Sequence, residues 1–311
     1  MDEIPSARTF WDREVVVPSH TSWMEHPRIR EYILRSVSGS DQMLWPIDWF
    51  ETWLNGRKFD RALSIGCGSG ALERDLVRRN LVRRIEGLDG SSNSLRVARA
   101  AAAAEGMSKR IGYFAADFNE PVLPRRTFDA VFIHQALHHV AKLEKLLRVV
   151  MRALKPDGVL YLDEYIGPSR HDWTEEQLVR HRQLFESLPL EVRRFPRLNP
   201  PIQDDDPSEA IRSAEIMTQL RIGFDVLALR PYGGNLLAVL YPYAEPERID
   251  PRTIERWIDE ERDLLRTGAP PFYAVVVAEP KQGMAGRIAS SRYFVEPKVK
   301  RIGREIRGRR G

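Results

Sequence analysis

The stretch ALSIGCGSGALE, residues 62–73, places three glycines between a short apolar run and an amphipathic run. The apolar run, 61–66, predicts a buried strand, and residues 71–80 predict a helix with apolar side chains on one side. Glycines at such a turn let the backbone bend sharply and approach a ligand closely. Because the first turn of a helix has free N–H groups, the helix that follows would point donors at that ligand.

An acidic residue follows the glycine loop at an informative distance. Asp89 ends a second predicted strand, residues 83–89, where a carboxylate can accept hydrogen bonds from both hydroxyls of a ribose. The loop and this acid together predict a ligand that contains adenosine. Since Ala71 also completes the pattern G-x-G-x-x-A, these residues alone leave NAD open as that ligand.

Strands and helices alternate along the next part of the chain. Further strands are predicted at 111–117, 128–134, 159–165, 224–230 and 272–278, and helices at 94–106, 140–154 and 249–268. Most of these strands are apolar along their whole length, as strands are when helices cover both faces of a sheet. The sequence therefore predicts an α/β fold with a mostly parallel, Rossmann-like sheet.

Three regions fall outside this alternation. Residues 1–57 are rich in aromatic side chains and predict a helical N-terminal cap, with a substrate lid as the alternative. Residues 166–220 predict a helical insertion within the main domain, 58–280. There, Asp172 and Glu175 resemble an N-cap pair that opens a helix. Residues 235–241 fit a strand or a buried helix equally well, and residues 281–311 predict a flexible tail.

Composition narrows the class of protein. The chain has 311 residues and an ordinary balance of apolar and charged side chains, which suits a water-soluble globular protein. It contains no apolar run long enough to cross a membrane, and its first residues lack the apolar core of a signal peptide. Cys67 is the single cysteine, so a cytoplasmic location is expected.

The positive charge is concentrated at the C-terminal end. Residues 281–311 carry ten Lys and Arg against two Glu, whereas the whole chain has a net charge of +4. The rest of the chain is therefore acidic, which argues against a nucleic-acid partner. We expect the tail to be a solvated end. Weak contact with an anionic membrane surface, at the inner face of the membrane, is the alternative.

The order of motifs resembles class I S-adenosylmethionine-dependent methyltransferases over about 200 residues. The motifs are ALSIGCGSGALE, EGLDGS, AADFNEP, FDAVFIHQALHHV and LKPDGVLYLDEY. A dehydrogenase would not be expected to reproduce the last three. The resemblance implies a seven-stranded sheet, in which 224–230 and 272–278 are the last two strands. The opening WD…SWMEHPRIREYI is similar to bacterial small-molecule methyltransferases, some of which act on sugars or polysaccharide precursors.

The resemblance also implies which residues hold S-adenosylmethionine. The glycine loop would line its methionine and ribose parts, Asp89 with its neighbours would hold the ribose, and Asp117 would accept from the adenine amino group beside Phe118. His134 and Gln135 would lie under the sulfonium. The implied cofactor-binding residues are Ser64, Gly66, Cys67, Gly68, Gly70, Asp89, Gly90, Ser91, Asp117, Phe118, His134 and Gln135. Ser64 departs from the family, which usually has an acid there, so another group or a water must help hold the ligand's amino group.

Catalysis is predicted less sharply. An oxygen acceptor must lose a proton during methyl transfer, and Glu164, His138 and His139 are the candidate bases because they lie near strand ends. Structural roles are the alternative for all three. No metal site is predicted, because adjacent histidines do not share a helix face and no H-x-x-x-H spacing occurs.

The insertion supplies candidate contacts to the acceptor, namely His171, Trp173, Arg180, His181 and Arg212. The function predicted is methyl transfer to a small-molecule acceptor, with a hydroxyl of a sugar or polysaccharide precursor as the first suggestion. The alternatives are an NAD(P)-dependent oxidoreductase and a non-catalytic S-adenosylmethionine-binding protein.

Overall fold

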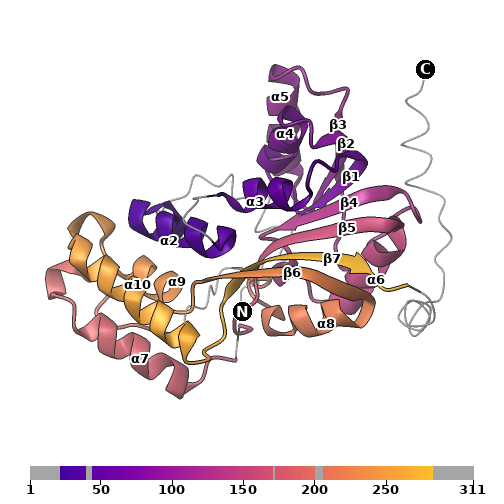
Figure 1. Ribbon diagram of the computed structural model, residues 1–311. Coiled ribbons are helices and arrows are strands. Elements are labelled where there is room, and N and C mark those ends of the chain that lie inside the picture. The colour runs from indigo at the N-terminus through magenta and orange to yellow at the C-terminus, as the bar shows by residue number, and fades with distance from the viewer. Residues whose placement is uncertain (1–21, 40–43, 171, 200–205, 283–311) are drawn as a thin grey trace, which may run out of the picture.

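A computed structural model describes residues 22–39, 44–170, 172–199 and 206–282. Within them, seven strands form one sheet in the order β3-β2-β1-β4-β5-β7-β6 (Figure 1). The strands are β1 (Phe59–Ile65), β2 (Val82–Asp89), β3 (Ile111–Ala115), β4 (Phe128–His134), β5 (Leu154–Tyr165), β6 (Phe224–Gly233) and β7 (Tyr273–Pro280). Strands β1 to β5 are parallel, and β7 is antiparallel to both of its neighbours. The predicted α/β class and its seven-stranded, mostly parallel sheet are confirmed.

Helices cover both faces of this sheet because side chains alternate along its strands. On β1, Ala62 faces the core under one set of helices, and Leu63 faces the core under the other. The first face carries α3 (Pro46–Trp53), α4 (Ala71–Arg78) and α5 (Ser92–Ala104). The second face carries α6 (Leu143–Ala153) and α8 (Ile216–Gly223). Burial on both faces accounts for the continuous apolar runs of the central strands.

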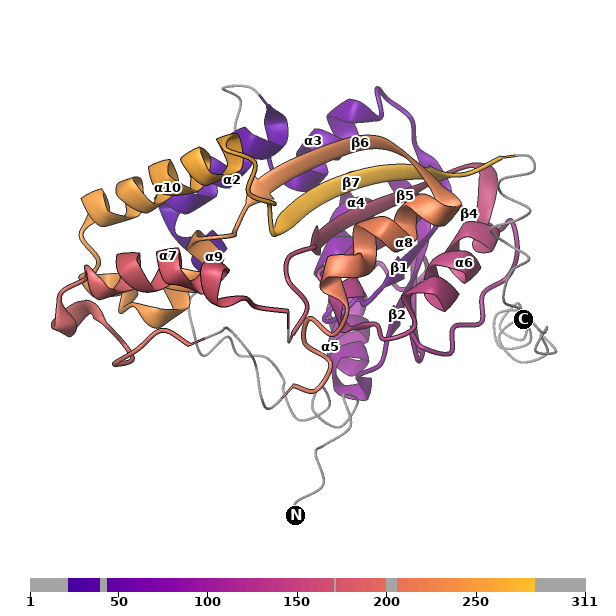
Figure 2. The same ribbon diagram turned by 90° about the horizontal axis from the view of Figure 1, so that it is seen from below.

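A second group of helices lies beside the sheet (Figures 1 and 2). This helical lobe consists of α2 (Pro27–Ser38), α7 (Glu175–Glu186), α9 (Leu237–Leu240) and α10 (Pro251–Arg266). Residues 235–241 fitted a strand or a helix equally well in the sequence, and the structure shows a short helix, α9, at 237–240, followed by a 3-10 turn that begins at Tyr241. Glu261 on α10 joins the lobe to the end of β6, because its carboxylate accepts hydrogen bonds from the N–H groups of Gly234, Leu236 and Leu237 at 2.8–3.0 Å.

The start of α7 differs from the expectation. Asp172 was expected to cap this helix together with Glu175, but Thr174 is the N-cap residue. The Thr174 hydroxyl accepts from the Gln177 N–H at 3.2 Å, and the Gln177 side chain accepts from the Thr174 N–H at 2.9 Å. This reciprocal pair satisfies two helix-terminal donors, which a single carboxylate two residues earlier would not do.

We expect Thr174→Ala to lower the free energy of unfolding by about 1 kcal/mol, because the cap loses its side-chain acceptor. Thermal unfolding would measure the change. Thr52→Ala is a matched control, since Thr52 lies inside α3 and its hydroxyl bonds only back to the Asp48 carbonyl. Equal effects of the two substitutions would contradict the capping role.

Several expectations fall on residues outside the described ranges. Residues 1–21 and 283–311 are among them, so the boundaries of the cap and the role of the basic tail stay predictions. Among the residues that are described, no helix is both long and apolar enough to cross a membrane.

Candidate active site

The glycine loop follows β1, and its glycines serve two purposes. Gly66 and Gly70 have φ values of +73° and +78°, and a Cβ on either would lie 2.2 Å from the nearest side-chain atom, on Ala136 or Tyr113. Packing alone therefore requires these two. Gly68 has φ +49°, and a Cβ there would meet nothing within 4 Å. Gly68 consequently leaves open space at the end of the sheet, where a ligand can approach the backbone.

Asp89 lies against this loop, as its place at the end of β2 predicts. Its Oδ2 accepts a hydrogen bond from the Gly68 N–H, and its Oδ1 accepts one from the Ser91 N–H, both at 2.8 Å. Each carboxylate oxygen can accept a further hydrogen bond. Two backbone donors thus fix the carboxylate while it retains the capacity to bind ribose hydroxyls.

Asp117 and Phe118 follow β3 and line a largely apolar cavity of about 250 Å³, together with Ile65 and Leu88. The Oδ1 of Asp117 accepts from the Asn119 N–H at 2.8 Å, so this residue also closes a turn. Asp117 and Phe118 thus lie together beside this cavity, and their contact with adenine stays a prediction.

Glu73 is a residue of the site that the sequence analysis missed. It lies in the first turn of α4 with its side chain fully buried, and neither carboxylate oxygen has a hydrogen-bond partner of good geometry among the described residues. Burial raises the pKa of Glu73 to about 7, although the neighbouring Ser64 hydroxyl opposes the shift. The signal was present, because Glu73, Leu76 and Val77 share the spacing of a buried helix face.

The glycine loop thus has an acid beside Ser64 after all. The sequence indicated that a group other than residue 64, or a water, must help hold the ligand's amino group. Glu73 comes from helix α4, whereas the family's usual acid comes from the strand. A buried carboxylate without a hydrogen-bond partner is costly unless a cation or a hydrogen-bond donor can approach it.

The ends of β4 and β5 carry a second polar network. His134 is half-exposed, with its Nε2 3.6 Å from the buried Asp163 carboxylate. Tyr232 donates a hydrogen bond to Asp163 at 2.7 Å, and Gln135 contacts Tyr232. Gln135 has φ +49°, an uncommon conformation for this residue type, where the chain turns away from β4. His134 and Gln135 therefore lie at the carboxyl edge of the sheet, beside the glycine loop.

Glu164, at the end of β5, has a carboxylate whose oxygens are already engaged by other groups of the protein. Its carboxylate accepts from the N–H groups of Ala136 and Leu137 at 2.9 and 2.6 Å, from Tyr165 N–H at 2.8 Å, and pairs with His138 Nδ1. The side chain is fully buried. This geometry favours a positioning role for Glu164 over direct contact with an acceptor.

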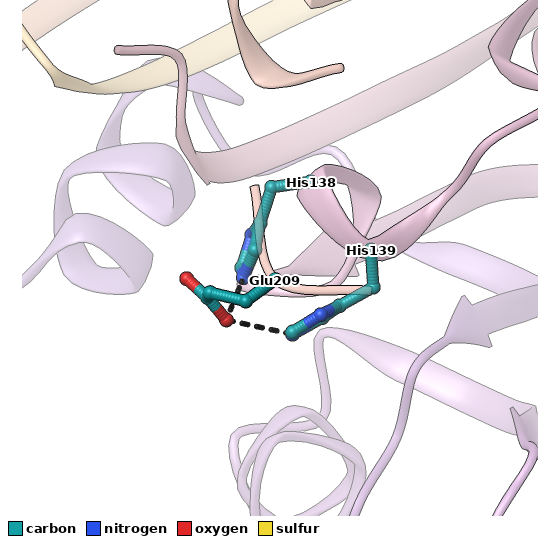
Figure 3. Close-up of side chains that lie close together, drawn as sticks. All are labelled: His138, His139 and Glu209. Carbon is teal, nitrogen blue, oxygen red and sulfur yellow. Dashed lines mark ion pairs between the residues drawn. The ribbon is translucent and has the colours of Figure 1, made fainter. Parts of the chain in front are cut away.

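His138 and His139 lie in a 3-10 turn, with ring centroids 4.0 Å apart. Glu209, from the insertion, faces both rings (Figure 3). Burial lowers the pKa of His138, but the neighbouring carboxylates, above all Glu164, raise this pKa to about 9. Burial and the neighbouring His138 charge lower the pKa of His139 to about 2. Burial also raises the pKa of Glu209. No local pattern in the sequence pointed to Glu209.

A cavity of about 330 Å³ opens beside this cluster, at the carboxyl end of β5 and the start of β7. Its walls are mainly aromatic, with charged groups at the edge. The lining includes Tyr165, Trp173, Phe195, Tyr243, Phe272, Tyr273, Arg170, Arg194 and Glu209.

Of the insertion residues that were expected near an acceptor and that the structure describes, one lines the cavity and three have other partners. Trp173 lines the cavity. Arg180 pairs with Glu260, and Arg212 pairs with Glu144 and Glu215. His181 is buried between the Gln177 and Asn235 carbonyls. These three side chains therefore have structural partners, and His171 lies outside the described residues.

One family model matches the part of the chain that contains the glycine loop. Residues 63–162, about a third of the chain, match the family model described as a methyltransferase domain. Together with the sheet order, this match makes the segment similar to class I S-adenosylmethionine-dependent methyltransferase domains. The cofactor of that class is S-adenosylmethionine, and the assignment of the glycine loop to it belongs to the proposal below.

Two curated relatives cover parts of the chain. A sterol 24-C-methyltransferase of Aspergillus fumigatus is 30% identical over 112 residues, which is 36% of this chain and 29% of that protein. The mitochondrial ubiquinone biosynthesis O-methyltransferase of Bos taurus is 31% identical over 160 residues, 50% of this chain and 40% of that protein. The matched segments thus span well under half of each relative.

A solved structure matches more of the fold. Geranyl diphosphate C-methyltransferase from Streptomyces coelicolor, in complex with Mg²⁺, geranyl diphosphate and S-adenosyl-L-homocysteine, has a TM-score of 0.52. It covers 87% of this chain and 94% of its own, at 14% identity. These relatives come from a fungus, a mammal and a bacterium, so the resemblance to bacterial enzymes stays a prediction.

Proposed function

We propose that this protein transfers the methyl group of S-adenosylmethionine to a hydroxyl of a small molecule bound in the aromatic cavity. The observation that carries the proposal is that the Asp89–Gly68 contact and this cavity lie at the same edge of the sheet. Open α/β sheets bind their ligands at the carboxyl ends of the strands. The placement supports a cofactor and an acceptor held side by side.

The residues at the glycine loop fit the cofactor. Asp89 would accept from the ribose hydroxyls, and Asp117 with Phe118 would hold the adenine. Ser64 would accept from the ammonium group while its own hydroxyl donates to Glu73, so the positive charge of the ligand would offset the burial of this carboxylate. When bound, S-adenosylmethionine supplies an electrophilic methyl group on its sulfonium.

The chain itself would mainly position the acceptor and exclude water. Trp173, Phe272 and Tyr273 form apolar walls, and Glu209 forms a polar end that His138 and His139 face from behind the cavity lining. We propose that the reacting hydroxyl binds at this polar end, where its proton can leave. Glu164 would act through His138, which it holds in place.

The cavity restricts the acceptor by size and shape. About 330 Å³ suits a compact ring system rather than a long chain, and aromatic walls stack on flat or apolar ring faces. A phenol and a sugar unit both meet these conditions. A hydroxyl of a sugar or polysaccharide precursor therefore remains part of the proposal.

Calorimetric titration with S-adenosylhomocysteine, NAD and NADP tests the cofactor. We expect S-adenosylhomocysteine to bind, and Asp89→Ala to weaken binding by about 1–3 kcal/mol because a charge-assisted ribose contact is lost. Asp157→Ala is a matched control, since Asp157 is a highly exposed acid at the opposite end of the sheet. Binding of NAD or NADP alone would refute the proposal.

Turnover tests the acceptor. Purified protein would be incubated with S-adenosylmethionine and panels of phenols and sugar derivatives, and S-adenosylhomocysteine would be measured. Product with one panel identifies the acceptor class. A protein that binds the cofactor tightly and turns over neither panel would instead support a non-catalytic binding role.

A further inference from the structure

Three side chains converge at the polar end of the aromatic cavity. His138 Nε2 lies 3.8 Å from Glu209 Oε2, and His139 Nε2 lies 3.7 Å from the same oxygen. Figure 3 shows both rings directed at this one carboxylate. One atom from each of the three residues lies within 4.8 Å of the others. The expectation that adjacent histidines point apart assumed a helix, and it does not apply in this 3-10 turn.

The opposite nitrogen of each ring has its own acceptor. His138 Nδ1 pairs with the Glu164 carboxylate. His139 Nδ1 lies 3.2 Å from Ser208 Oγ, and this hydroxyl donates to Asp206 Oδ1 at 2.7 Å. A Ser208 hydroxyl that donates to Asp206 accepts from His139, which places the proton of His139 on Nδ1. The Nε2 atoms of both rings face Glu209, in the arrangement that orients metal-binding imidazoles. The Glu164 carboxylate favours protonated His138, so this ring would release its Nε2 proton when a metal ion binds.

The spacing of these atoms suits a shared cation. Separations of 3.7 and 3.8 Å are too long for hydrogen bonds. Two ligands about 2.1 Å from one tetrahedral metal ion would lie roughly 3.4 Å apart, so the two distances to Glu209 exceed this spacing by only a few tenths of an ångström. Glu209 is partly exposed, so it has room to move.

The negative charge around the two histidines also favours a bound cation. Glu164, Asp206 and Glu209 place three carboxylates around two imidazoles, and Arg170 is the cation that acts on Glu209 from the insertion. Asp206 is fully buried, and its Oδ2 has no hydrogen-bond partner among the described residues. A buried acceptor of this kind is costly unless positive charge is near.

We propose that His138 Nε2, His139 Nε2 and Glu209 bind one divalent transition-metal ion, with Zn²⁺ as the best match to two imidazoles and a carboxylate. Glu209 lines the aromatic cavity, so a metal ion bound to it would lie at the edge of the space assigned to the acceptor. An acceptor hydroxyl bound there would lose its proton to solvent more readily, and its oxygen would become the nucleophile for the methyl group. This role rests on the proposed function, whereas the binding of metal does not.

The test is direct measurement of metal on the full chain. Protein treated with a chelator and desalted would be titrated with Zn²⁺ and with Mg²⁺ by calorimetry, and bound zinc would be counted by mass spectrometry. We expect one Zn²⁺ per chain and much weaker binding of Mg²⁺. Co²⁺ in place of Zn²⁺ should give the visible absorption of a four-coordinate ion.

Three variants assign the ligands. Glu209→Gln removes a partly exposed ligand and should weaken Zn²⁺ binding at least 100-fold, while Ser208→Ala, which loosens His139, should weaken it about 10–100-fold. Glu191→Gln, at an exposed glutamate elsewhere in the insertion, should leave it unchanged. Circular dichroism would confirm that each variant is folded. Absence of stoichiometric Zn²⁺, or equal binding by Glu209→Gln, would overturn the proposal.

The same samples separate this inference from the proposed function. S-adenosylhomocysteine binding would be measured with and without Zn²⁺. A protein that binds S-adenosylhomocysteine but no metal keeps the methyltransferase proposal and refutes the metal site. A protein that binds Zn²⁺ through Glu209 but not S-adenosylhomocysteine gives the reverse result.

Discussion

Glu164→Ala should lower the free energy of unfolding by about 3–5 kcal/mol, because it removes one partner of a buried ion pair with His138. The N–H groups of Ala136 and Leu137 would lose their acceptor at the same time. Each buried donor without a partner adds to the loss. Chemical denaturation, followed by fluorescence and circular dichroism, would measure the change.

A surface glutamate provides the control for this experiment. Glu120 is about half-exposed and pairs with Lys142 and Lys145. Glu120→Ala should change stability little, because solvent screens exposed ion pairs. If Glu164→Ala were no more destabilising than Glu120→Ala, the hydrogen bonds at the end of β5 would not hold the 136–138 turn as described.

Glu73 should make the ligand-free protein less stable as the pH rises from about 4.5 to about 7. Its folded-state pKa is raised above the ordinary value of 4.5, so between these pH values the unfolded chain loses a proton that the folded chain keeps. Stability therefore falls with rising pH in this window, by about 3 kcal/mol at most, and is constant above it. Denaturant unfolding at pH 5 and pH 8 would measure the difference for the wild type and for Glu73→Gln, which should lack this component.

Binding of S-adenosylhomocysteine should lower the pKa of Glu73. An ammonium group held by Ser64 would favour the charged form of Glu73, so S-adenosylhomocysteine binding near pH 6 should release up to one proton. Calorimetry in buffers of different ionisation enthalpy counts such protons. Release of the same number by Glu73→Gln would show that Glu73 does not interact with the bound amino group.

The sequence predicted the part of the molecule that depends on local pattern. The strands were recognisable because burial on both faces makes them apolar, and the glycine loop because Gly66 and Gly70 adopt positive φ. Asp89 was predicted because the end of a parallel strand fixes where its carboxylate lies. For these features a short window of sequence contains all the necessary information.

Features that depend on distant contacts were not predictable in this way. Glu209 meets His138 and His139 only because the insertion returns over the 3-10 turn. Ser208 and Asp206 matter only through His139. The role of Glu73 depends on the identity of residue 64 on a neighbouring element. Periodicity reports whether a position is buried, but it does not report which residue will be its partner.

The aromatic cavity and the glycine loop come from different parts of the chain. Every residue that lines the cavity lies at or after Tyr165, in segments that follow β5, β6 and α10. The loop and its acids come from residues 64–91, ahead of them in the sequence. Selection can therefore remodel the cavity by substituting or lengthening these later segments without disturbing the cofactor contacts. Descendants of one ancestral gene could diverge in the molecule they methylate while inheriting the same methyl donor.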